Sequence, residues 1–169
     1  MNKAHFAIAL LCLSSSFASS QTQAPAQPQG PEQPQFIQQG NQLAKDGKLQ
    51  EALQLYGAHL DNPADAFAAN IAVGNTLDLM GDGHRAKVHF AKALEIASTP
   101  QQKAQANRAT AMSYAFAGDC KKAVEYQQKV FDYQKEQKDF FAQGEVANEA
   151  ARVCIDAGDL DMAYEWYKM

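Results

Sequence analysis

Small and large apolar residues recur along the chain from residue 36 onward, with a spacing of 34 positions between the first two copies. Gly40 corresponds to Gly74, and Tyr56 corresponds to Phe90. Two further copies follow at spacings of 37 and 40 with the same order of small and large positions. Matches in register over a full period are typical of a protein built from structural repeats. We therefore expect repeats over about 36–63, 64–100, 101–138 and 139–169, the last one incomplete.

Within each copy, the apolar spacing and the abundance of alanine predict two helices joined by a tight turn. A glycine stands at each turn because glycine accepts the left-handed conformation that ends a helix. In three copies an aspartate after the glycine can cap the next helix. The turn glycines are Gly47, Gly81, Gly118 and Gly158. The predicted helices are 35–46 and 49–61, 64–80 and 83–97, 101–117 and 120–137, and 140–157 and 160–169.

Positions on both sides of each turn carry small residues, which lets two antiparallel helices approach closely. An aromatic residue then fills the wedge between the helices at Tyr56, Phe90 and Tyr167, whereas Gln127 in the third copy is expected to weaken that repeat. The small residues are Gly40, Gly74, Ala111 and Ala151 before the turns, and Ala52, Ala86, Ala123 and Ala163 after them.

This order of residues resembles the tetratricopeptide repeat family over about residues 35–169. The Gly-Asp turns and Pro63 at the end of the first copy fit the family, whereas its Trp in the first helix is replaced in every copy. The longer spacings and the segment 163–167 are also similar to Sel1-like repeats, which we keep as the alternative. Both resemblances imply an all-α fold, an α-solenoid of about four antiparallel helix-turn-helix repeats. The residues at the family's Trp position are Phe36, Asn70, Asn107 and Ala147.

The first twenty residues have the layout of a secretory signal peptide. Lys3 supplies the positive charge, residues 6–13 form a short apolar run, and small residues follow it. Cleavage fits after Ala18 or after Ser20, while an uncleaved anchor and a lipoprotein signal at Cys12 remain alternatives. A membrane-spanning helix needs about 20 apolar residues, so this run is too short to span. We therefore expect an exported protein, either periplasmic or secreted.

Residues 21–35 form a Gln- and Pro-rich segment without a large apolar side chain, so we expect a disordered linker.

A formal net charge of −4 and the lack of a strongly basic stretch argue against nucleic-acid binding. The sequence has no local motif for a metal, a phosphate or a catalytic nucleophile. We expect a non-enzymatic protein without cofactor, metal site or catalytic residues.

The resemblance to tetratricopeptide repeats implies a site, because the first helices of successive repeats line a groove that takes an extended peptide or a partner helix. The recurring amides of Asn41 and Asn75 offer donors and an acceptor to a peptide backbone. Arg108 and Arg152 offer guanidinium groups to a carboxylate. The alternative is a polar face that only contacts solvent. The expected groove residues are Asn41, Asn75, Arg108, Met112, Phe116, Asn148 and Arg152.

Two features leave alternatives open. Cys120 and Cys154 lie where neighbouring repeats should meet. They form either a disulfide or two separate buried thiols. A disulfide would close a loop of about 35 residues and stabilise the fold by roughly 3–4 kcal/mol. The short last helix leaves apolar residues at the C-terminal end. This end either frays, is covered in a longer natural chain, or is covered by a second copy in a homodimer over Trp166 and Tyr167.

The sequence therefore favours an exported protein–protein interaction module that binds a peptide or partner helix in its groove. The alternative function is a structural or assembly subunit of an envelope complex that makes its contacts through the edge of the solenoid.

Overall fold

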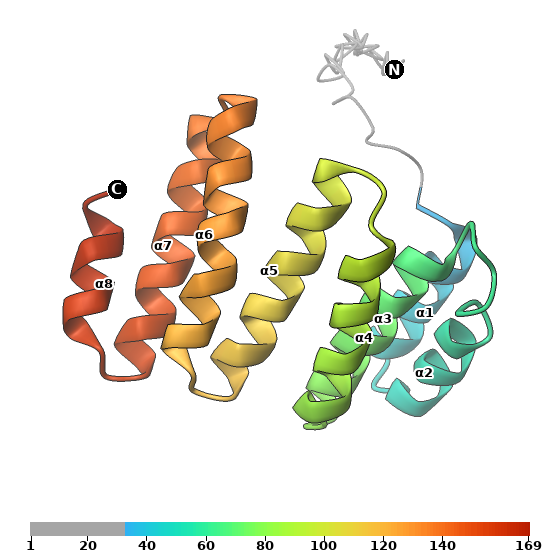
Figure 1. The fold of residues 1–169 in the computed structure, drawn as a ribbon. Coiled ribbons are helices and arrows are strands. Elements are labelled where there is room, and N and C mark those ends of the chain that lie inside the picture. Colours follow the sequence, from blue (N-terminus) through green and yellow to red (C-terminus); the bar gives the residue numbers. More distant parts are fainter. Residues whose placement is uncertain (1–32) are drawn as a thin grey trace, which may run out of the picture. The chain divides into compact units, whose positions relative to one another are not determined.

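The computed structural model describes residues 33–169, so the predicted signal peptide and nearly all of the predicted linker lie outside the described residues. Residues 33–169 form eight α-helices and no strand. Each helix packs on its neighbour in the chain, which stacks antiparallel pairs in order (Figure 1). The predicted all-α solenoid is confirmed. The helices are α1 (Gln35–Lys45), α2 (Leu49–Gly57), α3 (Ala66–Leu79), α4 (Gly83–Ile96), α5 (Pro100–Phe116), α6 (Cys120–Gln137), α7 (Phe140–Asp156) and α8 (Leu160–Tyr167).

The turn inside each pair is built as the sequence predicts. All four turn glycines have a φ between 74° and 82°, a conformation that other residues rarely adopt. The residue after each glycine donates its backbone N–H to a carbonyl five positions earlier, as Asp82 does to Leu77 at 2.8 Å. This pattern is a Schellman motif, which satisfies carbonyls at the end of the first helix. Asp82, Asp119 and Asp159 then cap the second helices by accepting the N–H three positions on.

Helix α2 ends four residues earlier than predicted, at Gly57 rather than residue 61. The following residues form turns as far as Asp65. The side chain of Asn62 stabilises these turns by accepting the N–H of Ala64 at 3.2 Å and donating to Asp65 at 2.7 Å. Such local bonds offer the backbone an alternative to the helix.

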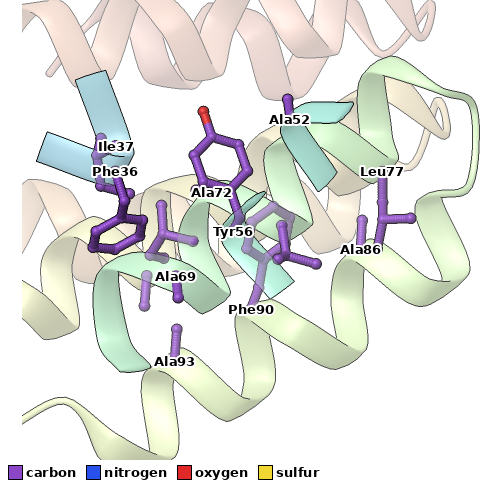
Figure 2. Close-up of a cluster of buried hydrophobic side chains, with 13 residues drawn as sticks. Phe36, Ile37, Ala52, Tyr56, Ala69, Ala72, Leu77, Ala86, Phe90 and Ala93 are labelled. Carbon is purple, nitrogen blue, oxygen red and sulfur yellow. The ribbon is translucent and has the colours of Figure 1, made fainter. Parts of the chain in front are cut away.

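The first two repeats share one continuous hydrophobic core (Figure 2). Tyr56 and Phe90 are fully buried, and their rings lie directly over Gly40 and Gly74. A Cβ at either glycine would overlap the ring carbons, so glycine is required here for close approach rather than for a turn. The small–large pairing expected from the sequence therefore holds in these two repeats.

In the third repeat the same place is filled by Ala111 and Gln127, both fully buried. A separate core cluster begins beyond them and extends through α6, α7 and α8 around Phe131 and Val146. The replacement of an aromatic ring by an amide thus places a buried polar side chain outside both of these clusters. A third, smaller cluster contains Cys120, Cys154 and Ala163.

The fourth repeat departs from the prediction, because Tyr167 does not fill the wedge. Tyr167 is 53% exposed, whereas its neighbour Trp166 is only 5% exposed and meets Phe131 edge-to-face at a centroid distance of 5.8 Å. We attribute the change to Ala151, whose methyl group stands where glycine leaves room for a ring in the first two repeats. Most of the Trp166 ring is therefore buried in the chain's own core and is not available for the expected dimer contact. The homodimer stays a prediction.

Cys120, the first residue of α6, forms a disulfide with Cys154 of α7. Their Cα atoms lie 5.0 Å apart, within the range that a disulfide can span. The sulfur of Met162 lies 3.4 Å from Cys120 Sγ, so α8 packs onto the bridge as well. Of the two alternatives that the sequence left open, the structure contains the bridge, and it fastens the third repeat to the fourth.

The first helices α1, α3, α5 and α7 form one row, and the second helices form the other. Within the first row, α1 contacts α3 and α3 contacts α5, whereas the backbones of α5 and α7 approach each other less. None of the described helices combines the length and the apolar character that crossing a membrane requires.

Candidate functional site

The seven predicted groove residues all lie on first helices, and the structure brings four of them together. Arg108 and Met112 from α5 and Asn148 and Arg152 from α7 line one hollow of about 440 Å³. The hollow lies where the two helices are spaced more widely. The other lining residues are Glu145, Glu149, Val153 and Asp156.

The remaining three predicted residues do not line this hollow. Phe116 is at the last turn of α5 and is exposed, while Asn41 and Asn75 lie on α1 and α3. Asn41 and Asn75 occupy corresponding positions one repeat apart, and both are exposed. They extend the polar row of first helices away from the hollow rather than contributing to it.

Asn41 and Asn75 differ in their bonding. The hydroxyl of Tyr56 donates to Asn41 Oδ1 at 2.9 Å, so the carbonyl of this amide already has an intramolecular partner. In the second repeat Phe90 replaces the tyrosine and has no hydroxyl to donate. Among the described residues, the Asn75 side chain makes no hydrogen bond. The exposed Asn75 amide therefore keeps its donors and its acceptor free of partners within the described residues.

Glu149 was missed by the sequence analysis and organises the hollow. Its carboxylate lies 3.2 Å from Arg108 Nε, accepts a second bond from Arg108 Nη2 at 3.3 Å, and accepts the amide of buried Gln127 at 3.1 Å. One carboxylate thereby joins α5, α6 and α7. The only signal in the sequence is an acidic residue 41 positions after an arginine, which spacing alone does not single out.

The two arginines of the hollow therefore have different roles. Arg108 is paired with Glu149 and holds the wall together, so the predicted pairing of Arg108 with a ligand carboxylate would compete with an internal contact. Arg152 forms no ion pair within residues 33–169 and is exposed on α7. Arg152 is the guanidinium available to a ligand.

Burial shifts the pKa of a few groups near the first helices. Desolvation raises the pKa of the Asp78 carboxyl, and this effect is opposed by a hydrogen bond from Ser113 at 2.9 Å and by the charge of Lys87. This contact between Asp78 and Ser113 joins α3 to α5.

No group of three metal-ligating side chains occurs within the described range.

Comparison of the chain with models of known protein families found no match. Comparison with curated proteins also found no match.

Proposed function

We propose that the chain is an exported, non-catalytic interaction module, and that an extended peptide binds along its first helices. The observation that carries this proposal is the hollow between α5 and α7, with Arg152 unpaired and Asn148 beside it. The resemblance of the repeats to tetratricopeptide repeats supports the same surface. A side-chain amide can bond both groups of a peptide unit, and a guanidinium favours a carboxylate.

In this proposal Arg152 binds an acidic side chain or the terminal carboxylate of the peptide. Asn148 and Asn75 bond the peptide backbone, and Met112 contacts an apolar side chain. Arg108 and Glu149 fix the spacing of α5 and α7, so the hollow exists before the peptide arrives. A site formed in advance avoids part of the ordering cost of binding.

The proposal is tested by selecting 12-residue peptides from a displayed library on the full chain, then measuring the binding of selected peptides by calorimetry. Arg152→Ala and Asn75→Ala should each weaken binding at least tenfold. Arg85→Ala is the matched control, because Arg85 is an exposed arginine of α4, outside the hollow. Asn41→Ala is less informative since it also removes the bond from Tyr56. Peptides that bind all four variants equally would exclude this groove.

A second candidate function is that of an assembly subunit which makes its contacts through the solenoid edge. Phe140 and Phe141 favour it, because they are 74% and 78% exposed at the α6–α7 corner. Adjacent exposed aromatic residues are enriched at protein interfaces. A partner that is lost in Phe140→Ser/Phe141→Ser but retained in Arg152→Ala would favour the edge over the groove.

A further inference from the structure

A second hollow lies on the other row of helices, between α6 and α8. It measures about 600 Å³, which is within the range of ligand pockets. No residue of α5 or α7 lines it, so it is separate from the proposed peptide groove. Its apolar lining residues are Val124, Met162, Tyr164, Trp166 and Met169.

The charged residues that line this pocket all have the same sign. Glu125 comes from α6, Asp159 caps α8, and Asp161 and Glu165 lie on α8. No lysine or arginine is among the lining residues. An apolar floor whose charged lining residues are all acidic favours a ligand that carries an apolar group beside a positive charge.

Two lysines outside the lining already show how the rim binds cations. Lys122 lies 2.8 Å from Glu125, and Lys168 lies 2.7 Å from Glu165. The ammonium of Lys168 is also 4.7 Å from the centroid of the Tyr164 ring, a cation–π contact. Both lysines are about half exposed, so a ligand cation can displace them at little cost. Neither Asp159 nor Asp161 has an ion-pair partner among the described residues. Asp159 accepts the N–H of Met162, so Asp161 is the rim acid without an intramolecular partner.

From this juxtaposition we infer that the α6–α8 pocket binds a cationic peptide segment, in which a large apolar side chain stands next to Lys or Arg. The apolar side chain packs on Met162 and Trp166. The positive charge lies at Asp161 and Glu165. Anionic lipids and acidic peptides are repelled by the same rim, which separates the specificity of this pocket from that of the Arg152 hollow.

Trp166 allows a direct test, since it is the only tryptophan of the chain and it lines the pocket. The probes are two acetylated and amidated tetrapeptides, Lys-Phe-Leu-Lys and Glu-Phe-Leu-Glu, titrated into the full chain at low ionic strength. The lysine peptide should change the tryptophan emission to saturation, and its affinity should fall as salt is added. The glutamate peptide should cause no saturable change.

The matched variants reverse charge on the rim and away from it. Asp161→Lys/Glu165→Lys should weaken the lysine peptide at least tenfold, whereas the control Glu51→Lys/Glu95→Lys changes two exposed acids of α2 and α4 and should bind like the original chain. Equal binding of both peptides, or unchanged affinity in the rim variant, would overturn the inference. Circular dichroism of each variant shows whether it is folded. If the rim variant is unfolded, Asp161→Asn/Glu165→Gln replaces it, and we expect its affinity for the lysine peptide to be at least threefold lower.

A second copy of the chain is the competing occupant. Sedimentation velocity of the unliganded chain distinguishes the two, because a cationic peptide requires an empty pocket on a monomer. Concentration-dependent dimers that the lysine peptide does not dissociate would overturn the inference. The Arg152→Ala variant should bind the lysine peptide with unchanged affinity. The inference about this pocket and the proposed function of the groove are therefore tested separately.

Discussion

The ring of Phe90 on α4 occupies the space directly above Gly74 on α3, where any other residue would place its Cβ. Carbon atoms Cδ1 and Cζ of the ring would each lie 2.7 Å from that Cβ, well below normal van der Waals contact. Both residues are buried and their helices are fixed by contacts on several sides. The pair therefore admits no larger residue at position 74 without movement of the ring or the backbone.

Gly74→Ala should destabilise the protein by roughly 1–3 kcal/mol, because overpacking of a buried contact outweighs the gain in helix propensity. Urea denaturation followed by circular dichroism measures the change. Gly144→Ala is the matched control, since Gly144 lies within α7 and a Cβ added there would have no neighbouring atom within 4 Å. That variant should be more stable by up to about 1 kcal/mol. Equal effects of the two substitutions would contradict the steric argument.

The Cys120–Cys154 bridge should stabilise the protein by about 4 kcal/mol, because it closes a loop with a sequence separation of 34 residues in the unfolded chain. A Cys120→Ala/Cys154→Ala variant should lose most of this, as measured by urea denaturation without reductant. Adding dithiothreitol should destabilise the original chain and leave the variant unchanged. On the denatured, unreduced protein, thiol-specific labelling of Cys120 and Cys154 would contradict the bridge.

His89 should make the folded protein less stable as the pH falls. Its pKa lies below the usual 6.5 because burial disfavours the charged ring, and the charge of Arg85 adds to this. Asn70 Nδ2 donates to Ala66 at 2.8 Å, so Asn70 Oδ1 is the acceptor for Nδ1–H of the neutral ring at 3.0 Å. Below pH 6.5 the unfolded chain binds a proton that the folded chain does not, so stability is lost as the pH falls toward the folded-state pKa.

An NMR titration of the imidazole protons checks this directly, and the His89 pKa should lie below the usual 6.5. In urea denaturation at pH 7.5 and 5.5, His89→Gln should reduce the loss of stability on acidification. A His89 resonance that titrates above 6.5 would show that the ring is charged in the fold.

Most of the fold could be predicted from the sequence, because the features that define it are local. A turn glycine identifies each helix pair, and in three of the four pairs an aspartate follows it. The structure has the left-handed glycines and the three aspartate caps at those positions. The early end of α2 could not be predicted from periodicity, since it depends on side-chain bonds of Asn62. The burial of Trp166 instead of Tyr167 depends on the single methyl group of Ala151 and on contact with Phe131.

The candidate site was predicted less completely. The resemblance to tetratricopeptide repeats implied groove positions for Arg108, Met112, Asn148 and Arg152, and the structure gathers these four in one hollow. Periodicity says nothing about partners across repeats, so the sequence did not reveal that Glu149 already holds Arg108. The acid-rimmed pocket was missed for the same reason, because it joins residues of α6 to residues of α8 about 40 positions apart.

The third repeat allows the Gly74–Phe90 packing to be introduced where it is missing. Ala111 and Gln127 stand at the places of Gly74 and Phe90, and Gln127 Oε1 is buried without a hydrogen-bond partner. An unsatisfied buried polar atom costs about 1–3 kcal/mol. The repeat therefore retains a polar residue where an aromatic ring would pack, and its amide is used to bond Glu149.

Gln127→Phe alone should destabilise the protein, because its ring would meet the methyl group of Ala111. Adding Ala111→Gly recreates the pair found in the first two repeats and should recover stability, even though glycine in a helix costs about 1 kcal/mol relative to alanine. In a double-mutant cycle measured by urea denaturation, we expect a favourable coupling of roughly 1–2 kcal/mol. Gln127→Phe combined with Gly144→Ala is the control and should be additive, because Gly144 has no neighbour to relieve. If the effects of Gln127→Phe and Ala111→Gly are also additive, the third repeat does not share the packing of the first two.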